Sequence, residues 1–334
     1  MRVSRALVAS SLGFAAVMGV AAWARLSNVP AALGTGELLP PDGDSAYHLL
    51  RILRTAERFP HAPTFDAAMA WPDGGACPWA DGFDVGGAAF VLALGGAGSP
   101  ARAALLAALY PAVLGLLVVW AAMALARAVA PPWAAEPVAL AAGLLAALLP
   151  QGVAASRFAR VDHHVLEALA MVLLARWALT RPASAEEPSR CRMLFEIEGA
   201  LLSAGALWVF TGATVYAALA AGVVLASILA RPGRQPVVGS GAPALLCGGG
   251  LAAILTLPAI AEHGRWLSYQ YPSMLQPSLV AAAGAGLALG ALSGGLLPRA
   301  GAAVRAAACL AAGAACAAAA AIAWPRLASE VARG

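Results

Sequence analysis

Long apolar stretches separated by short polar segments dominate the chain. The first apolar stretch is residues 6–24, and eight more follow at 103–126, 137–150, 165–180, 194–210, 213–230, 242–260, 279–297 and 306–324. Most of them approach the roughly 20 residues that a helix needs to cross a bilayer. The pattern predicts an all-α polytopic membrane protein with about nine spans, forming a single transmembrane domain over residues 1–334.

The longest polar segment follows the first span, residues 1–24. Residues 25–102 are expected to form a first external loop, in which apolar residues 85–98 are too short to cross and instead form an interfacial helix. Residues 103–324 hold the remaining spans, and 325–334 form a short external tail without a soluble C-terminal domain. A cleavable signal peptide is the alternative for the first span, because AAWA at 21–24 resembles a cleavage site.

The arginine distribution orients this arrangement. With nine spans, the arginine-rich short segments fall on the cytoplasmic side, as the positive-inside rule requires. All seven Asp and all five His then fall on the outer face. If 85–98 crossed the membrane instead, Asp162 would move to the opposite face from Asp44, and the arginines would scatter.

Composition supports a membrane protein and narrows its function. The apolar fraction is 61%, the charged fraction 11% and the mean hydropathy +0.78, whereas soluble domains have about 45–50% apolar and about 25% charged residues. Neither a basic tract nor an aromatic-basic pattern for nucleic acid is present. The five Cys are scattered, without metal-type spacing or a disulfide framework.

Two outer segments carry candidate chemistry. The first begins DGDSAYHLLR at 42–51, where residues 45–58 predict a short amphipathic helix. Asp44 directly precedes this helix, so it is either an N-cap or a functional carboxylate. Four later aspartates are expected to form turns; they are Asp66, Asp73, Asp81 and Asp84.

The second segment is SRFARVDHHVLEAL at 156–169. Asp162, His163 and His164 directly precede a span, where polar groups are costly and usually functional. Asp162 and His164 point the same way if the segment is extended. Together with Asp44 they offer two carboxylates and an imidazole, a set that suits Mn²⁺ and, less well, Mg²⁺; Zn²⁺ is the alternative.

Further candidates surround this set. Glu167 and His48 are candidates to orient a metal ligand from behind. Arginines near the outer face bind either a diphosphate or lipid headgroups; they are Arg157, Arg160 and Arg265. Trp208 precedes FTG at the outer end of a span, a position also typical of aromatic-belt residues.

The ordered motifs resemble the catalytic subunit family of oligosaccharyltransferases, most closely the archaeal type. Members of this family carry an Asp followed by Tyr-His and Arg, then an FD stretch, a turn and a second Asp-containing end. The segments DSAYHLLR, FPHAPTFD, WPDGG and WADGFD stand here in that order. The second family motif, Asp-His-His before an apolar helix with Glu, is similar to DHHVLEAL. The likeness covers about residues 1–215.

The resemblance implies a GT-C-like glycosyltransferase fold at the plasma (inner) membrane, with a divalent cation and an active site on the extracytoplasmic face. The donor would be a polyprenyl-linked sugar, and the acceptor a protein, lipid or glycan. By motif position, Asp44, Asp162 and His164 would be the catalytic metal ligands. The donor-binding residues would be His163, Trp208, Arg160 and Arg265.

Other features depart from this family. The chain has fewer spans and lacks the family's C-terminal Trp-Trp-Asp motif, and Met274 stands where an acceptor-binding Glu is expected. A non-catalytic or partner-dependent relative, with a partner subunit supplying the acceptor site, is therefore one alternative. A lipid-linked glycan transporter or flippase is another, although such proteins tend to show repeats and mid-membrane charges that are not evident here.

Overall fold

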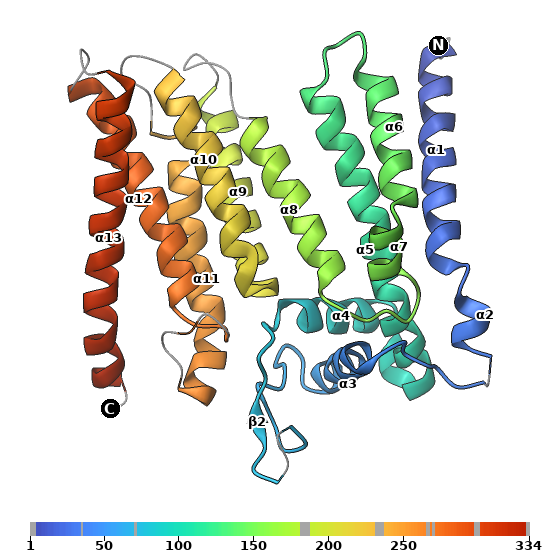
Figure 1. The fold of residues 1–334 in the computed structure, drawn as a ribbon. Helices are drawn as coiled ribbons and strands as arrows, with labels where there is room; N and C mark the ends of the chain where they lie inside the picture. Colours follow the sequence, from blue (N-terminus) through green and yellow to red (C-terminus); the bar gives the residue numbers. More distant parts are fainter. Residues whose placement is uncertain are drawn as a thin grey trace. The chain divides into compact units, whose positions relative to one another are not determined.

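The structure is a computed structural model that describes residues 5–34, 36–69, 72–180, 188–230, 237–264, 268, 271–296 and 301–331. Helices dominate it (Figure 1), as the apolar pattern predicted. The chain divides into two compact units, one comprising residues 1–63 and 81–173 (unit 1) and the other residues 64–80 and 174–334 (unit 2).

Unit 1 contains most of the elements that carry the outer polar segments. Its elements are α1 (Arg5–Leu26), α2 (Val29–Ala32), α3 (Gly43–Glu57), α4 (Gly82–Ala93), η1 (Gly96–Gly98), α5 (Pro100–Val129), α6 (Ala135–Leu148), α7 (Pro150–Ser156) and the first part of α8 (His164–Leu179). Unit 2 contains the rest of α8 and β1 (Phe65–Asp66), β2 (Gly75–Ala76), α9 (Ser189–Val209), η2 (Thr211–Ala213), α10 (Thr214–Ala230), α11 (Ala242–His263), α12 (Leu275–Leu296) and α13 (Ala302–Val331).

The apolar helices indicate a multi-pass membrane protein. Among the described residues, five helical segments are long and apolar enough to cross a bilayer, and six if the bent pair α6 and α7 is one span. The other predicted spans are helical too, but α8 has only 16 residues, α9 carries several charges and the described apolar part of α13 is residues 306–319. Nine spans remain a prediction.

In unit 1, α1, α5 and α6 pack along one another. Val17 and Ala21 of α1 join a buried cluster with Met123 of α5 and Ala139 of α6. This packing joins α1 to the other long helices of the unit. A bend of 62° separates α6 from α7, at Pro150, whose missing N–H cannot continue the helical hydrogen bonds.

Helices α3 and α4 lie across one end of α1, α5 and α6, where the chain also passes before entering α8 (Figure 1). Helix α4 has 12 residues and does not reach spanning length, as predicted for 85–98. A buried cluster joins Ile52 of α3, Phe83 of α4 and Tyr110 of α5. Gly87 allows this packing, since a Cβ there would lie 2.5 Å from Ile52 Cδ1.

In unit 2, a carboxylate holds one helix start in place. Glu196 of α9 is buried and accepts backbone N–H groups from Gly239, Gly241 and Ala244, at 2.7, 2.9 and 2.8 Å. It thereby satisfies donors at the start of α11 that have no intrahelical partner. The short β1–β2 hairpin, antiparallel with Phe65 opposite Ala76, was not predicted.

Candidate functional site

The N-terminus of α3 is capped by Asp42 rather than Asp44. The Asp42 carboxylate accepts the backbone N–H of Ser45 at 2.8 Å, and α3 begins at Gly43. Of the two alternatives for Asp44, the N-cap is therefore wrong, because the helix begins at Gly43. Asp44 instead lies exposed in the first turn of α3. A negative charge there interacts favourably with the positive end of the helix dipole.

The buried face of α3 is polar. His48 and Arg51 are at most 1% exposed, and both meet Asp84 in the first turn of α4. Asp84 Oδ1 lies 2.8 Å from His48 Nδ1, and Asp84 Oδ2 accepts Arg51 Nη1 at 2.5 Å. Arg51 Nη2 also donates to Asp81 at 2.8 Å and to the Pro63 carbonyl at 3.1 Å.

These contacts correct the prediction that Asp81 and Asp84 only form turns. Asp84 is fully buried and binds two side chains of α3, so it fixes the position of one helix against the other. Asp66, by contrast, accepts the N–H of Ala68, and Asp73 lies exposed in a turn. The turn interpretation is correct for these two residues.

Three backbone and side-chain contacts position the loop between α7 and α8. Phe158 donates its N–H to the Arg25 carbonyl at 2.9 Å, and Asn28 donates to the Phe158 carbonyl at 2.9 Å. Ala159 donates to the Ala108 carbonyl at 2.9 Å and adopts a left-handed φ of 65°. Such a φ is uncommon for alanine, so the ends of α1 and α5 impose this turn on the loop.

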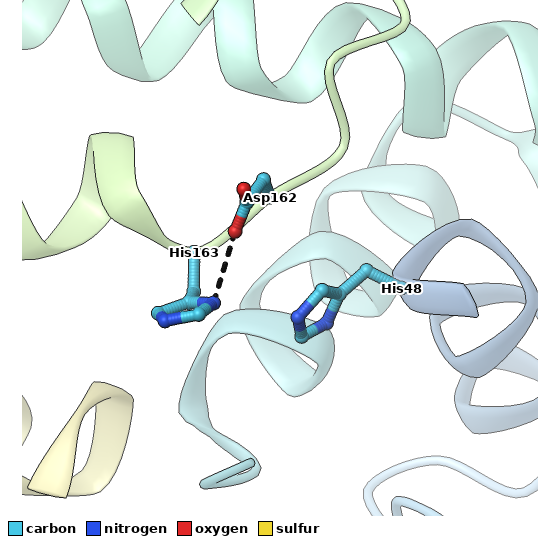
Figure 2. Close-up of side chains that lie close together, drawn as sticks. All are labelled: His48, Asp162 and His163. Atoms are coloured by element: carbon cyan, nitrogen blue, oxygen red, sulfur yellow. Dashed lines mark ion pairs between the residues drawn. The ribbon is translucent and has the colours of Figure 1, made fainter. Parts of the chain in front are cut away.

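Asp162 lies at the end of this loop and is buried (Figure 2). Its Oδ1 is 3.0 Å from His163 Nδ1, and its Oδ2 is 3.9 Å from His164 Nε2. Arg160 Nη2 approaches Oδ2 at 3.5 Å, and Arg160 Nη1 forms an ion pair with Asp42. Arg160 therefore ties this loop to the start of α3, at the same end of unit 1, as the nine-span arrangement predicted.

The electrostatic surroundings keep Asp162 ionised. Burial by itself would raise its pKa, but the hydrogen-bonding approach of His163 and the charges of His164, His163 and His48 lower the pKa below its usual value. The pKa of His164 is raised, first by its contact with Glu167 and then by Asp162 and Glu167 as charges, against an opposing effect of burial. The imidazoles around Asp162 thus favour the charged form of its carboxylate.

His163 and His164 have different environments. His163 is buried, and its ring centroid lies 5.4 Å from that of His48 and 4.4 Å from that of His164. His164 is exposed, and its Nδ1 lies 3.0 Å from Glu167 Oε2. Glu167 is therefore placed to orient His164, as expected of a residue behind a metal ligand.

Among the described residues, two groups of side chains have a geometry that could hold a metal ion. In one, His48, Asp162 and His163 place ligand atoms within 4.8 Å of one another, and in the other His163, His164 and Glu167 do so. The buried Asp162 Oδ1 lies 3.0 Å from His163 Nδ1, but within the described residues no hydrogen bond to it has a directed geometry. A buried carboxylate oxygen that faces imidazoles in this way fits a bound cation.

The predicted site residues are only partly brought together. Asp162, His163, His164 and Arg160 are neighbours, and Glu167 and His48 adjoin them, but Asp44 belongs to neither metal-capable group. Trp208 is half-buried near the end of α9 in unit 2. Arg265 lies outside the described residues.

Sequence reasoning missed Asp42, Arg51 and Asp84. The spacing of Ser45, His48, Ile52 and Thr55, which share one buried face of α3, was the available signal. The sequence interpretation used the apolar residues of α3 instead. Of these, Ile52 is buried and Leu49 and Leu53 pack against its cluster, whereas Leu50 is exposed.

The fold and this polar end define a polytopic helical membrane protein of the kind that forms the transmembrane region of an archaeal oligosaccharyltransferase. The chain matches crystal structures of the oligosaccharyltransferase of Archaeoglobus fulgidus. The apo form aligns with a TM-score of 0.71 and 18% identity, over 84% of this chain and 32% of that one. A complex of the same protein, AglB, with an inhibitory peptide and a dolichol-phosphate aligns with a TM-score of 0.73 and 19% identity, over 91% and 36%.

A third structure of that enzyme, a complex with Zn and sulfate, aligns with a TM-score of 0.73 and 18% identity, over 93% of this chain and 39% of that one. The chain thus spans about a third of the length of these solved structures. No family model matches the chain, and neither does any curated protein. At this identity the likeness establishes the fold, which is the fold that the sequence motifs predicted.

Proposed function

We propose that this chain is a metal-dependent membrane glycosyltransferase. It would move a sugar or oligosaccharide from a polyprenyl (di)phosphate carrier to an acceptor. The observation that carries the proposal is the buried Asp162 among three histidines, at one end of a helical unit in a fold shared with an oligosaccharyltransferase. By motif position, Asp44, Asp162 and His164 are the proposed metal ligands.

The chemistry suits these residues. A divalent cation, when bound, would neutralise the charge that develops on a diphosphate leaving group. Asp162 is kept ionised by its histidine neighbours, and Glu167 holds the His164 ring. Arg160 is 30% exposed while it contacts Asp42 and Asp162, so part of its guanidinium remains accessible to a phosphate oxygen.

The remaining donor contacts and the placement of the site belong to the same proposal. His163, Trp208 and Arg265 are proposed to contact the donor with Arg160. Nine spans would place this end of unit 1 on the extracytoplasmic face of the plasma membrane. The A. fulgidus enzyme has been captured with dolichol-phosphate and with a peptide containing an NVT sequon, which supports a polyprenyl carrier and a protein acceptor here.

One observation favours a partner-dependent form of this function. Met274, which stands where the resemblance expects an acceptor-binding Glu, has a side chain that is 1% exposed. A buried thioether offers no hydrogen bond to an acceptor amide. A partner subunit, or an acceptor other than an Asn side chain, would then complete the reaction.

The test uses the full chain in detergent with Mn²⁺, Mg²⁺ or Zn²⁺ and a labelled polyprenyl-diphosphate sugar. Carrier cleavage and transfer are measured for the wild type and for Asp44→Ala, Asp162→Ala and His164→Ala. The controls are Asp73→Ala and His61→Ala, which remove an exposed carboxylate and an exposed imidazole that belong to neither metal-capable group. We expect the three site variants to lose at least about 100-fold in rate, as loss of a metal ligand would require.

Retention of wild-type turnover in all three site variants would contradict the proposed metal site. Activity that arises only after a partner protein is added would establish the partner-dependent form. Carrier movement across vesicles without cleavage would instead establish a transporter.

A further inference from the structure

The two metal-capable groups differ in depth. His48, Asp162 and His163 are all buried, whereas His164, in the other group, is 55% exposed at its side chain. Asp162 faces both histidines of the DHH motif through different oxygens, Oδ1 toward His163 and Oδ2 toward His164. Asp162 thus lies next to both the buried group, with His48 and His163, and the more exposed His164.

The inner group has a firmly held first ligand. His48 Nδ1 is engaged by Asp84 at 2.8 Å, so Nε2 is the ring atom that remains for a metal. Asp84 is itself held by Arg51 at 2.5 Å. A carboxylate behind a histidine fixes the ring orientation and tautomer and raises its basicity, as it does behind metal-bound histidines in general.

The geometry of the other two ligands also fits. His163 Nδ1 and Asp162 Oδ1 are 3.0 Å apart, close to the separation of about 3.3 Å that bonds of about 2.0–2.1 Å give around a tetrahedral ion. Figure 2 shows the His48 ring, from α3, directed toward these two side chains from the opposite side. Its ligand atom lies within 4.8 Å of the other two.

The ligand types select the metal. Two imidazoles and one carboxylate make a ligand set that suits Zn²⁺. Mg²⁺ and Mn²⁺ prefer carboxylate, carbonyl and water oxygens, which the motif-based set with Asp44 supplies better.

We propose that His48, Asp162 and His163 form an inner metal site that prefers Zn²⁺, distinct from the set Asp44, Asp162 and His164. The inner site shares only Asp162 with that set, and Asp84 is the residue that positions His48. The inference rests on the proposed function only in that both place a divalent cation beside Asp162. It assigns the metal class from two histidines, His48 and His163, that the motif-based set does not use as ligands.

The test measures metal binding without any sugar donor. Zn²⁺, Co²⁺ and Mn²⁺ are titrated into the chelator-stripped full chain, with affinity determined by chelator competition and the Co²⁺ complex followed by its visible absorption. X-ray absorption at the zinc edge counts the imidazole ligands of the wild type. The variants are His48→Ala and Asp84→Asn, with Asp44→Ala as the probe of the outer set and His61→Ala as the control for an exposed imidazole.

We expect two imidazole ligands in the wild type and a tetrahedral Co²⁺ spectrum. His48→Ala is expected to weaken Zn²⁺ binding at least about 100-fold, and Asp84→Asn about 10–100-fold, since loss of a residue that orients a ligand costs that much. Asp44→Ala and His61→Ala should leave Zn²⁺ affinity within about threefold of the wild type.

The opposite pattern would overturn the inference: Zn²⁺ binding that is unchanged in His48→Ala and lost in Asp44→Ala, or a single imidazole at the zinc edge. The wild-type ligand count does not depend on whether a variant folds. Failure of sugar transfer with Zn²⁺ binding intact would count against the proposed function and leave the inner site standing.

Discussion

The carboxylate of Asp84 is the most deeply buried charge beside the candidate site, and its removal has a definite expected cost. Asp84 and Arg51 are both 0% exposed, and Asp84 contacts Arg51 and His48 at 2.5 and 2.8 Å. Removing one partner of a buried ion pair costs about 3–5 kcal/mol. Because Arg51 keeps Asp81 and the Pro63 carbonyl, we expect Asp84→Ala to fall near the lower value, about 3 kcal/mol.

The assay is thermal unfolding in detergent micelles, followed by intrinsic fluorescence. For a unit of about 150–250 residues, 1 kcal/mol shifts Tm by about 2–4 °C, so a decrease of about 6–12 °C is expected for Asp84→Ala. Asp81 is 14% exposed at its side chain and contacts Arg51 at 2.8 Å, so the Asp81→Ala variant should lose less stability than Asp84→Ala. Asp73→Ala, in an exposed turn, should change little.

A double variant tests the cause. Arg51→Met combined with Asp84→Leu removes both fully buried charges, and the carboxylate that loses its Arg51 contact, Asp81, is 14% exposed at its side chain. Much of the lost Tm should therefore return. If Asp84→Ala shifts Tm no more than Asp73→Ala, or if the double variant is less stable than Asp84→Ala, the buried-charge reasoning is refuted.

Two further predictions concern unit 2. Gly199→Ala would place a Cβ 2.2 Å from the Trp177 ring and should destabilise the protein by about 1–3 kcal/mol. Gly205→Ala on the same helix meets nothing within 4 Å and should stabilise the protein by up to about 1 kcal/mol. Equal Tm values for the two variants would contradict this packing. Glu196→Ala should lower the free energy of unfolding by at least about 2 kcal/mol, because three backbone N–H groups lose a charged acceptor. The matched control in the same melting assay is Glu198→Ala, since Glu198 is exposed on the same helix.

The helices were predictable because their apolar stretches are long. The predicted stretches 103–126 and 242–260 fall within α5 and α11, and 194–210 extends one residue beyond the end of α9. The short stretch 85–98 overlaps α4. The polar end was harder to predict. Two aspartates, Asp42 and Asp44, lie at the start of α3, and sequence alone does not decide which one caps the helix, since either has a suitable side chain.

The buried polar face of α3 could not be predicted from the order of apolar and polar residues in the sequence. Arg51 would ordinarily be assigned to the exposed side of an amphipathic helix, and its partner Asp84 lies 33 residues further along the chain. Only the packing of α3 against α4 brings the two together. The DHH motif, by contrast, is local, so Asp162 and its histidines could be recognised from neighbouring positions.

The network of Arg51 and Asp84 bears on function because a buried ion pair is weak evidence for a stabilising role. Apolar residues of similar volume often stabilise a protein as well or better, so stability alone does not account for two fully buried charges between α3 and α4. Asp84 also fixes the ring of His48, and an apolar replacement would lose that contact. The double variant Arg51→Met with Asp84→Leu separates the two roles: recovered Tm together with weakened Zn²⁺ binding would assign the network to the orientation of His48 beside Asp162.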